Sequence, residues 1–592
     1  MKISGDHAVV LGASMGGLLA ARVLADFYER VTLVERDTLP TNPENRRGVP
    51  QGRLIHAIQA RGTSILEELF PGFVDGLTAM GVECWDDGDL SKLHLVLGGH
   101  PLVRSGIAPD APSVLFPSRP LLEWSVRQRV KAIPNVTFLE GHDVLGLMTT
   151  SDLTRVTGAR VSGHAEDHET TLSADLVVDA TGRGSRMPVF LEQLGYGRPA
   201  EDELVVQLAY ACQLLRSTPS AVREHMVAMF PEPGRPRMFG FARYENDTCM
   251  LAVGTMAGAE PPKRLAELLD YAADFAPAHV LDAARNAEPI GGVVHHRVPS
   301  NRWRRYDKMR RFPDGLLVVG DAVCSFNPIY GQGMTVAAIE ATVLRDCLRR
   351  GSDRLPQRFF RATAKKVRVA WQTAVGSDLA LPEVAGPRPI SMRISNAFIE
   401  RVATASEVDV VVAGQFMRVT TMVDAPIWLL RPSILLRVMR AQRRRPPVEA
   451  GRRRREETEE RGTQLSNQNI ELTRQGYEAF SAGDLEAALS LFDDSAVWTI
   501  NGESAIGGTY RGKTELAELF MRLAEKSTQV ETKQFLADGD FVMVMTEVTA
   551  GGETAPEADV FELHGGKVVR AHSFGDTAVQ ERVFGSKRVA TS

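Results

Sequence analysis

The sequence predicts an α/β protein of several domains. A domain with a parallel sheet is interrupted by an inserted antiparallel β-sheet, and a helical tail and a C-terminal α+β cone follow it. Three observations predict this order. Residues 8–34 read as strand, glycine-rich turn, helix and strand, and an apolar strand at 316–319 runs into a second glycine-rich loop. A charged stretch at 441–466 then contains almost nothing that could be buried, so it separates residues 467–592 as a second compact unit.

Length and composition limit the class of protein. At roughly 100–200 residues per domain, the 592 residues predict three or four units. The apolar content of 44% and the charged content of 24% are typical of globular proteins, and the net charge of −5 gives no attraction to nucleic acid. Five scattered cysteines indicate reduced thiols and no metal site, as in a cytoplasmic enzyme. We expect neither a signal peptide nor a transmembrane segment, because no stretch reaches ~18 apolar residues.

The first glycine-rich turn, "GASMGG", has the context of a dinucleotide fingerprint, because it follows a strand and opens a helix. Gly12 allows the tight turn and Gly17 allows close packing of the helix on the sheet, while Ser14 replaces the second fingerprint glycine beside Gly16. Glu35 closes the second strand and suits a carboxylate that accepts hydrogen bonds from an adenosine ribose. This Rossmann-like pattern favours FAD or NAD over NADP at this site, since Glu35 would repel a 2′-phosphate.

The second glycine-rich loop, "GDAVCSFNPIYGQG", has the features of a flavin site. Asp321 ends the strand where it could accept hydrogen bonds from a ribityl chain. Gly331 and Gly333 would let backbone N–H groups reach the pyrimidine edge of an isoalloxazine, and a helix that begins near Met334 would stabilise negative charge on the reduced ring. The alternative is a tight strand–helix turn without a ligand.

The rest of the first part fits this scheme. We expect a hairpin at 93–104, a helix at 119–132, antiparallel strands within 203–260 and mostly helix over 335–440. The predicted divisions are FAD-binding parts at about 1–80, 110–190 and 290–350, a substrate sheet at about 81–109 and 191–289, a helical tail at 351–440, a linker at 441–466 and a final domain at 467–592.

Three patterns, "GASMGG" with Glu35, "DATGRGS" and "GDAVCSFNPIYGQG", resemble the flavin monooxygenases of the para-hydroxybenzoate hydroxylase type. "RRGVPQGRLIHAIQARG" and "PSRPLLEWSVRQRV" look like a bacterial secondary-metabolite branch that includes the olefin epoxidases of polyether antibiotic pathways. The resemblance covers about residues 5–440. It implies that Asp179 belongs to a motif that touches both FAD and the nicotinamide, and that Arg119 lies against the flavin. A surface salt bridge is the alternative for Arg119.

The chemistry that this resemblance implies is reduction of FAD by NAD(P)H, reaction with O₂ and transfer of one oxygen atom to a lipophilic small molecule. Such chemistry needs a dry cavity. Tyr210, Phe239 and Phe241 are candidate walls, with ordinary core packing as the alternative. Epoxidation of an alkene needs no deprotonation of the substrate, whereas phenol hydroxylation benefits from a base, for which His56 is a candidate.

Residues 467–592 resemble the SnoaL-like branch of the nuclear-transport-factor-2 superfamily, through "YEAFSAGDLEAALSLFDDSAVWTI" and "GGKVVRAHSFGDTAVQERVFG". The alternation of side chains places Glu557 and Asp559 on one face of a strand, and His572 and Asp576 on one face of the next. We expect Asp559, His572 and Asp576 to lie inside an apolar cone, where burial prepares a carboxyl for acid catalysis. The alternative is that they are structural polar groups or lie outside.

The leading reading is an FAD-dependent epoxidase or hydroxylase whose C-terminal domain opens or cyclises the epoxide. The alternatives are an aromatic hydroxylase whose last domain only forms a homodimer, a flavoprotein reductase, and a nucleotide sensor without activity. For two further segments, the sequence leaves two interpretations open. The charged stretch is a solvated linker or a basic arm that binds nucleic acid. Residues 424–445, which are apolar and then basic, pack against the FAD domain or lie on a membrane surface.

Overall fold

The computed structural model describes residues 4–164, 169–216, 221–443, 452–502, 504–538 and 540–586. The chain divides into two compact units, Met1–Arg445 and Pro446–Ser592, and each is described by itself. In the part of the chain that the structure describes, no helix is both long and apolar enough to cross a membrane.

A five-stranded parallel sheet, in the order β17-β11-β1-β2-β7, forms the centre of the nucleotide-binding part. The return of the chain at 316–319 to this sheet, as predicted, gives β17. Helix α1 begins at Met15 and ends at Leu24, because β2 begins soon afterwards at Tyr28, which pairs with Gly5 of β1. The strands are β1 (Gly5–Leu11), β2 (Tyr28–Glu35), β7 (Val136–Glu140), β11 (Leu176–Asp179) and β17 (Leu316–Val318).

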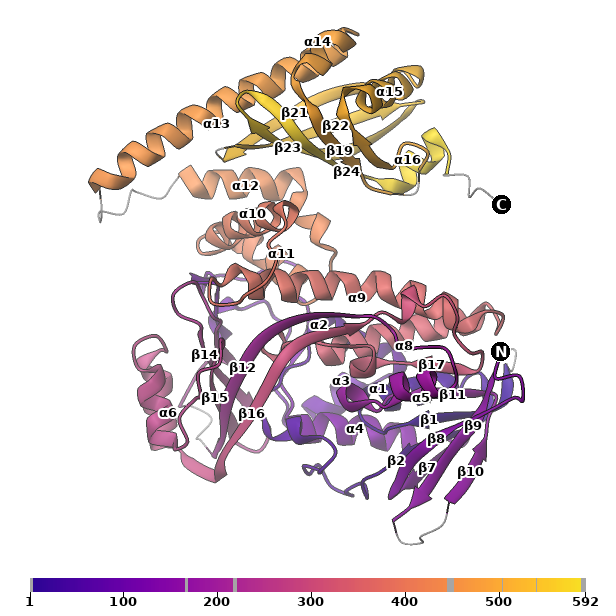
Figure 1. Cartoon of the computed structure of the whole chain (residues 1–592). Helices are drawn as coiled ribbons and strands as arrows, with labels where there is room; N and C mark the ends of the chain where they lie inside the picture. The colour runs from indigo at the N-terminus through magenta and orange to yellow at the C-terminus, as the bar shows by residue number, and fades with distance from the viewer. Residues whose placement is uncertain are drawn as a thin grey trace. The chain divides into compact units, whose positions relative to one another are not determined.

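The inserted sheet has eight strands in the order β18-β16-β12-β15-β14-β13-β4-β5. Figure 1 shows its long strands on one side of the first unit, with the parallel sheet and the small sheet β10-β9-β8 on the other. Its pairs are antiparallel as predicted, except that β13 runs parallel to β4. The sheet continues past its predicted end at 289, because the long strand β16 pairs with β12 along most of its length.

The bounds of these strands are as follows. The eight-stranded sheet contains β4 (Leu93–Leu97), β5 (His100–Pro101), β12 (Glu201–Arg216), β13 (Met226–Met229), β14 (Arg237–Tyr244), β15 (Thr248–Thr255), β16 (Glu288–Arg304) and β18 (Cys324–Ser325). The small sheets contain β8 (His142–Thr149), β9 (Val156–Gly163) and β10 (Glu169–Ser173), and β3 (Cys84–Trp85) with β6 (Val114–Leu115).

Helices pack against the parallel sheet and the eight-stranded sheet of the first unit. Helix α1 packs against α8, and α8 packs in turn against the long helix α9. Each of the two glycine-rich loops leads into one of the paired helices α1 and α8. The predicted helical tail is confirmed as α9 to α12. The α-helices are α1 (Met15–Leu24), α2 (Ala60–Leu69), α3 (Phe73–Thr78), α4 (Arg119–Lys131), α5 (Met187–Gln193), α6 (Leu265–Ala272), α7 (Ala278–Asn286), α8 (Gly333–Arg349), α9 (Leu355–Ala380), α10 (Ile390–Ser406), α11 (Val410–Thr420) and α12 (Pro432–Arg443).

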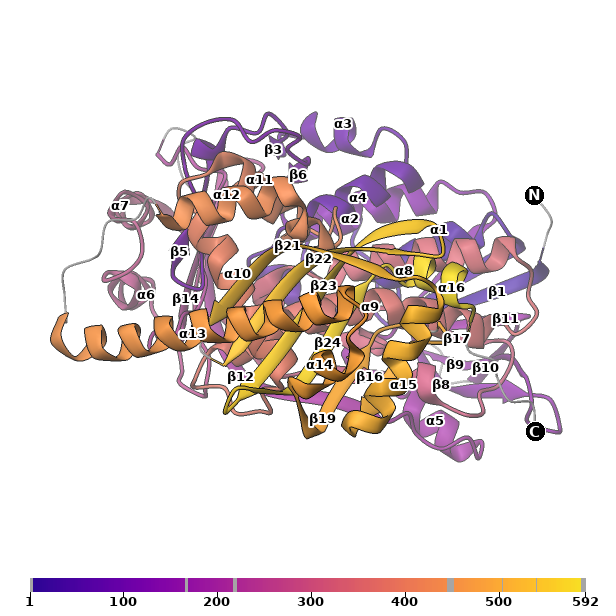
Figure 2. The ribbon, with the colours of Figure 1, turned by 90° about the horizontal axis from the view of Figure 1, so that it is seen from above.

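The second unit is an α+β domain with a six-stranded sheet in the order β20-β19-β24-β23-β22-β21. Helix α13 lies across β21 and β22 of this sheet (Figure 2). Aromatic side chains fill the space between helices and sheet, with Phe520 packed edge-on against Trp498. The elements are α13 (Arg452–Ser481), α14 (Leu485–Ser490), β19 (Phe492–Ile500), β20 (Gly508–Arg511), α15 (Gly512–Glu525), β21 (Gln529–Asp538), β22 (Phe541–Ala550), β23 (Glu553–His564), β24 (Lys567–Gly575) and α16 (Thr577–Phe584).

The predicted linker at 441–466 differs from the structure in its second half. Helix α13 begins at Arg452, so the charged residues from there onward are helical rather than irregular. Arginine and glutamate are good helix formers, which explains why a stretch with little to bury still forms a helix. The remainder of the linker, residues 444–451, lies outside the described residues.

Candidate functional site

The first glycine-rich turn leaves no room for side chains at two positions. Gly12 has a φ of +99°, and a Cβ on Gly17 would lie 1.8 Å from the carbonyl oxygen of Gly12. Gly16 faces the second loop, because its Cβ would be 3.9 Å from Cα of Gly320. Two motifs that are 300 residues apart in sequence therefore touch through glycines, at the N-terminal end of α1.

Glu35 lies next to this turn and belongs to a buried charged cluster. Its carboxylate accepts hydrogen bonds from the backbone N–H of Ala13 at 2.8 Å and of Asp37 at 3.0 Å, and it pairs with Arg46 at 3.1 Å. Arg46 also binds Glu123 at 2.7 Å. A carboxylate has about four acceptor positions, so Glu35 keeps one for a further donor such as a ribose hydroxyl.

Arg119 begins α4 and is buried, so the alternative of a surface salt bridge is wrong. Its guanidinium donates to Glu123 at 2.9 Å and to the hydroxyl of Ser14 at 3.0 Å, and it contacts the sulfur of Met334. Its Nε has no partner among the described residues. Arg119, Arg46 and Arg127 together keep the pKa of the Glu123 carboxyl below its ordinary value, even though burial raises it.

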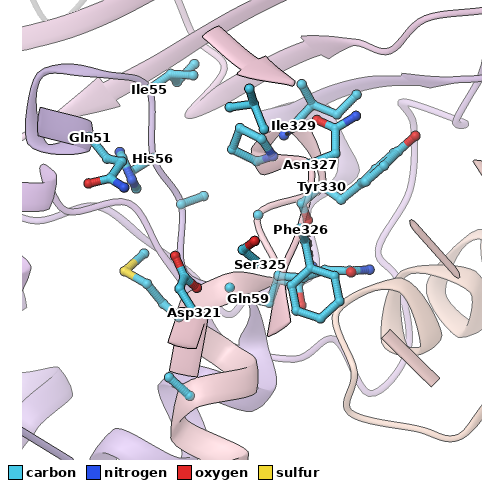
Figure 3. A pocket seen from close by; sticks show the side chains of 18 of the residues that line it. Gln51, Ile55, His56, Gln59, Asp321, Ser325, Phe326, Asn327, Ile329 and Tyr330 are labelled. Carbon is cyan, nitrogen blue, oxygen red and sulfur yellow. Dashed lines mark hydrogen bonds between the residues drawn. The ribbon is translucent and has the colours of Figure 1, made fainter. Parts of the chain in front are cut away.

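Asp321 follows β17 and borders a large cavity (Figure 3). No hydrogen bond from the described residues reaches its carboxylate, and burial raises its pKa. Gly331 has a φ of +64°, a backbone conformation that would be strained in a residue with a side chain. The N–H of Gly331 itself donates to the carbonyl oxygen of Pro328 at 3.0 Å, while the access that Gly331 and Gly333 give to a pyrimidine edge stays a prediction. The free N–H groups at this point are those of the first turn of α8, which begins at Gly333.

Asp179 ends β11 and is 1% exposed. Its carboxylate accepts hydrogen bonds from the N–H of Thr181 at 3.0 Å and from the hydroxyl groups of Thr181 and Ser185. The side chain therefore shapes the "ATGRGS" turn, while the backbone of the turn borders the cavity.

The cavity between these motifs has a volume of about 1360 Å³. A site for one small ligand typically measures roughly 300–1,000 Å³, so this cavity has room for two ligands end to end. Tyr210 and Phe239 contribute to its walls, as predicted, whereas Phe241 packs in the core against α6 and α7. His56 also lines the cavity.

A buried hydrogen-bond network that the sequence reasoning missed holds the loop after Asp321. Asp378, in the last turn of α9, is fully buried and accepts hydrogen bonds from Asn301 at 2.6 Å, Asn327 at 2.9 Å and the hydroxyl of Tyr330 at 2.8 Å. Burial raises the pKa of Asp378 to about 6 despite these donors. Asn327 and Tyr330 stand inside the predicted loop, but nothing in the sequence links them to residue 378.

The second unit has a smaller cavity of about 120 Å³, lined mostly by apolar side chains. Glu557 and Asp559 both border it, as the alternation along β23 predicted. The hydroxyl groups of Tyr477 and Ser573 donate to the Asp559 carboxylate. Burial and the neighbouring Asp559 raise the pKa of Glu557 to about 8, and burial also raises the pKa of Asp559.

Two predicted residues of this unit lie elsewhere. His572 faces away from the cavity, stacks on Phe574 at 4.4 Å between ring centroids and contacts Asn501, so its expected place inside the cone is wrong. Asp576 is exposed at the mouth and caps α16 by accepting hydrogen bonds from the N–H groups of Ala578 and Val579. Asp576 therefore has a structural role in the helix start.

Comparison with known families adds the deciding observation. Residues 7–352 match the model of the FAD binding domain, and residues 473–571 match that of the SnoaL-like domain. The chain is a group A flavin monooxygenase with a C-terminal SnoaL-like domain.

Two relatives and one solved structure agree with this assignment. Protein Rv3254 of Mycobacterium tuberculosis is 38% identical to this monooxygenase over 433 residues, which cover 71% of this chain and 90% of that protein. The 6-methylpretetramide 4-monooxygenase of Streptomyces rimosus is 27% identical over 378 residues, or 61% and 79% of the two chains. A flavoprotein/dehydrogenase from Cytophaga hutchinsonii shares the fold, with a TM-score of 0.53, 13% identity and coverage of 74% of this chain and 98% of that chain.

The residues of the monooxygenase fit its cofactor, FAD. The glycine turn at the start of α1 offers backbone N–H groups to a pyrophosphate, and Glu35 retains an acceptor for the adenosine ribose. The Asp321 carboxylate, which no hydrogen bond from the described residues reaches, would accept hydrogen bonds from hydroxyl groups of the ribityl chain. Gln332 is buried and its Oε1 has no partner among the described residues, so a polar edge of the ring system would satisfy it.

Proposed function

We propose that the chain is an FAD- and NAD(P)H-dependent monooxygenase that epoxidises an alkene of a polyketide- or terpenoid-type secondary metabolite. When bound, FAD supplies the reducing equivalents and the activation of O₂, and one oxygen atom enters the substrate while the other leaves as water. The protein itself supplies binding, orientation and exclusion of water.

The observation that carries this proposal is the size and lining of the cavity. Beyond the part that suits FAD, its walls are mainly apolar, with Leu95, Phe116, Met226 and Met238 from the inserted sheet and its approaches. An apolar wall of this kind suits a lipophilic substrate and keeps water away from the oxygen-transfer step. The apolar side chains of this wall also suit an alkene, because epoxidation requires no removal of a substrate proton.

Hydroxylation of an aromatic polyketide is the second candidate function. The name of the Streptomyces rimosus relative, 6-methylpretetramide 4-monooxygenase, supports it. In this case the SnoaL-like domain would serve dimerisation rather than catalysis.

For the leading function, we propose that the SnoaL-like domain opens or cyclises the epoxide. Glu557, which keeps its proton at neutral pH, would give it to the epoxide oxygen as the C–O bond breaks. Asp559, held by Tyr477 and Ser573, would accept the proton of the attacking water or internal hydroxyl. His572 and Asp576 have no part in this scheme, because neither lies inside the cone.

The test is mass spectrometry of the products that the FAD-loaded chain forms under ¹⁸O₂ from a panel of polyenes and aromatic polyketides. An epoxide, or a diol or cyclic ether derived from it, with one ¹⁸O atom supports the leading function. A phenol with one ¹⁸O atom supports the second. Oxidation of NAD(P)H without labelled product from any compound would refute both.

The role of the SnoaL-like domain is tested separately with 1,2-epoxyoctane supplied directly to the full chain. The Glu557→Gln variant should lose the hydrolysis that the wild type accelerates above buffer. If the wild type hydrolysed the epoxide no faster than buffer does, the role of this domain in epoxide opening would be refuted. The proposed oxygenase activity would not be affected by that result.

A further inference from the structure

His56 is held in the cavity wall by contacts on three of its atoms. Its backbone N–H donates to the hydroxyl oxygen of Tyr244 at 2.7 Å, and that hydroxyl donates in turn to the carbonyl oxygen of His56 at 3.0 Å. The ring atom Nδ1 lies 3.0 Å from the carbonyl oxygen of Leu54. Tyr244 is the last residue of β14, so the inserted sheet fixes the backbone of His56. The imidazole ring is oriented by Leu54, two residues earlier in the chain.

These contacts determine which ring nitrogen carries the proton. A carbonyl oxygen only accepts hydrogen bonds, so we assign the proton to Nδ1 and the lone pair to Nε2. Burial, together with the positive charge of Arg119, lowers the pKa of His56 to about 4, so the ring is neutral near pH 7. No hydrogen bond from the described residues reaches Nε2, which leaves one acceptor available at this wall.

The position of the ring makes this acceptor useful. In Figure 3, His56 lies on one side of the cavity and the loop of Ile329 and Tyr330 lies on the other, with Asp321 below and between them. Because Asp321 marks where the ribityl chain of FAD fits, a substrate between His56 and this loop would lie beside the flavin. A ligand without a donor would leave Nε2 buried and unpaired, which is unfavourable.

We propose that Nε2 of His56 accepts a hydrogen bond from a hydroxyl group of the substrate, so that the substrate is a lipophilic molecule that carries a free hydroxyl. This inference rests on the proposed oxygenase and narrows its substrate class to unsaturated alcohols or phenols. His56 acts here as an orienting acceptor. It does not remove the proton, because a phenol with a pKa near 10 is about six units too weak an acid to protonate a ring with a pKa of about 4.

The experiment compares each alcohol with its methyl ether, which has the same shape and no donor. Farnesol is compared with farnesyl methyl ether and 1-naphthol with 1-methoxynaphthalene, and affinity for the FAD-loaded chain is measured by calorimetry. The wild type should bind at least one alcohol roughly 10- to 100-fold more tightly than its ether, the range expected when a buried acceptor is left unpaired. In His56→Phe the two affinities should become equal, mainly through weaker binding of the alcohol.

Three further variants separate orientation from mere structure. His56→Gln, whose Oε1 can replace Nε2 as an acceptor, should regain part of the preference for the alcohol. Tyr244→Phe leaves the imidazole ring of His56 in place but removes the hydroxyl contacts to the backbone of His56. It should reduce the preference for the alcohol without abolishing it. Gln51→Leu removes a polar side chain that lines the same cavity and should keep the preference.

Equal affinities for alcohol and ether in the wild type in both pairs, or a preference that survives in His56→Phe, would overturn the inference. Failure of the proposed oxygenase has a different signature. In that case the alcohol preference and its loss in His56→Phe would persist, while no compound would yield a product labelled from ¹⁸O₂.

Discussion

The Tyr330→Phe substitution tests the network that holds the loop after Asp321. It removes one hydroxyl group and leaves the ring, which stacks on Phe230 with 3° between the ring planes. The hydroxyl donates to the buried Asp378 carboxylate at 2.8 Å, and no arginine or lysine pairs with that carboxylate among the described residues. Neutral donors alone therefore stabilise this carboxylate, and we expect the loss of any one of them to destabilise the folded protein.

The size of the effect depends on whether Asp378 is charged. Its pKa of about 6 means that it is ionised at pH 8 and largely protonated at pH 5. A hydrogen bond to a charged group contributes ~1.5–3 kcal/mol and one between neutral groups ~0.5–1.5 kcal/mol. The loss of the donor also raises the pKa of Asp378 further, so the destabilisation increases as pH rises through about 6.

Thermal unfolding followed by circular dichroism measures this difference. With an unfolding entropy of ~2.1 cal/mol/K per residue, a unit of 445 residues changes its Tm by about 1 °C per kcal/mol. We expect Tyr330→Phe to lower the Tm of the first unit by ~2–3 °C at pH 8 and by ~0.5–1.5 °C at pH 5. The matched control is Tyr306→Phe, because that buried hydroxyl has no partner among the described residues. A decrease of equal size at both pH values, or one that Tyr306→Phe reproduces, would refute the reasoning.

Two other substitutions and one pH profile of the wild type test further parts of the structure. Gly17→Ala places a Cβ 1.8 Å from the Gly12 carbonyl oxygen and should weaken FAD binding at least ~10-fold in a fluorescence titration, whereas Gly292→Ala, with open space around it, should not. Glu340→Gln should reduce the pH dependence of stability, because burial raises the pKa of Glu340 from 4.5 to about 8. The wild type should therefore lose more stability than the variant as pH rises between these values, which denaturant titrations at several pH values would reveal. If Glu557 is the acid of the SnoaL-like domain, epoxide opening by the wild type should fall above pH 8 as its carboxyl ionises, and a rate that instead rises there in a pH profile would contradict the assignment.

The sequence predicted those features of the structure that residues close together in the chain determine. The glycine turn at Gly12, the strand that precedes Asp321 and the helix that begins at Arg119 all depend on contacts within a few residues. Their burial and spacing are therefore readable from the sequence alone. The missed network is of another kind, since Asp378 meets Asn301 only because α9 returns over the end of β16, 77 residues away in sequence.

His572 illustrates a second limit. Alternation along a strand shows which side chains share a face, but not which face is inside. The structure resolves this through the pairing of strands, because Asp559 stands opposite Ser573 in the register of β23 and β24. Residues opposite each other point to the same side, so Ser573 joins Asp559 inside the cone and His572 must face outward.

The arrangement of the parallel sheet explains why the predicted flavin-binding residues meet although they are far apart in the chain. Gly12 follows β1, Glu35 ends β2, Asp179 ends β11 and Asp321 follows β17. All four strands are parallel and in register, with Leu11 opposite Asp179 and Asp179 opposite Val318. Their carboxyl ends therefore form one edge, where ligands bind in open α/β sheets. The eight-stranded sheet is largely inserted between β11 and β17, so the cavity that it helps to line lies at the same edge. The connectivity of the chain would therefore bring a substrate in this cavity close to the flavin.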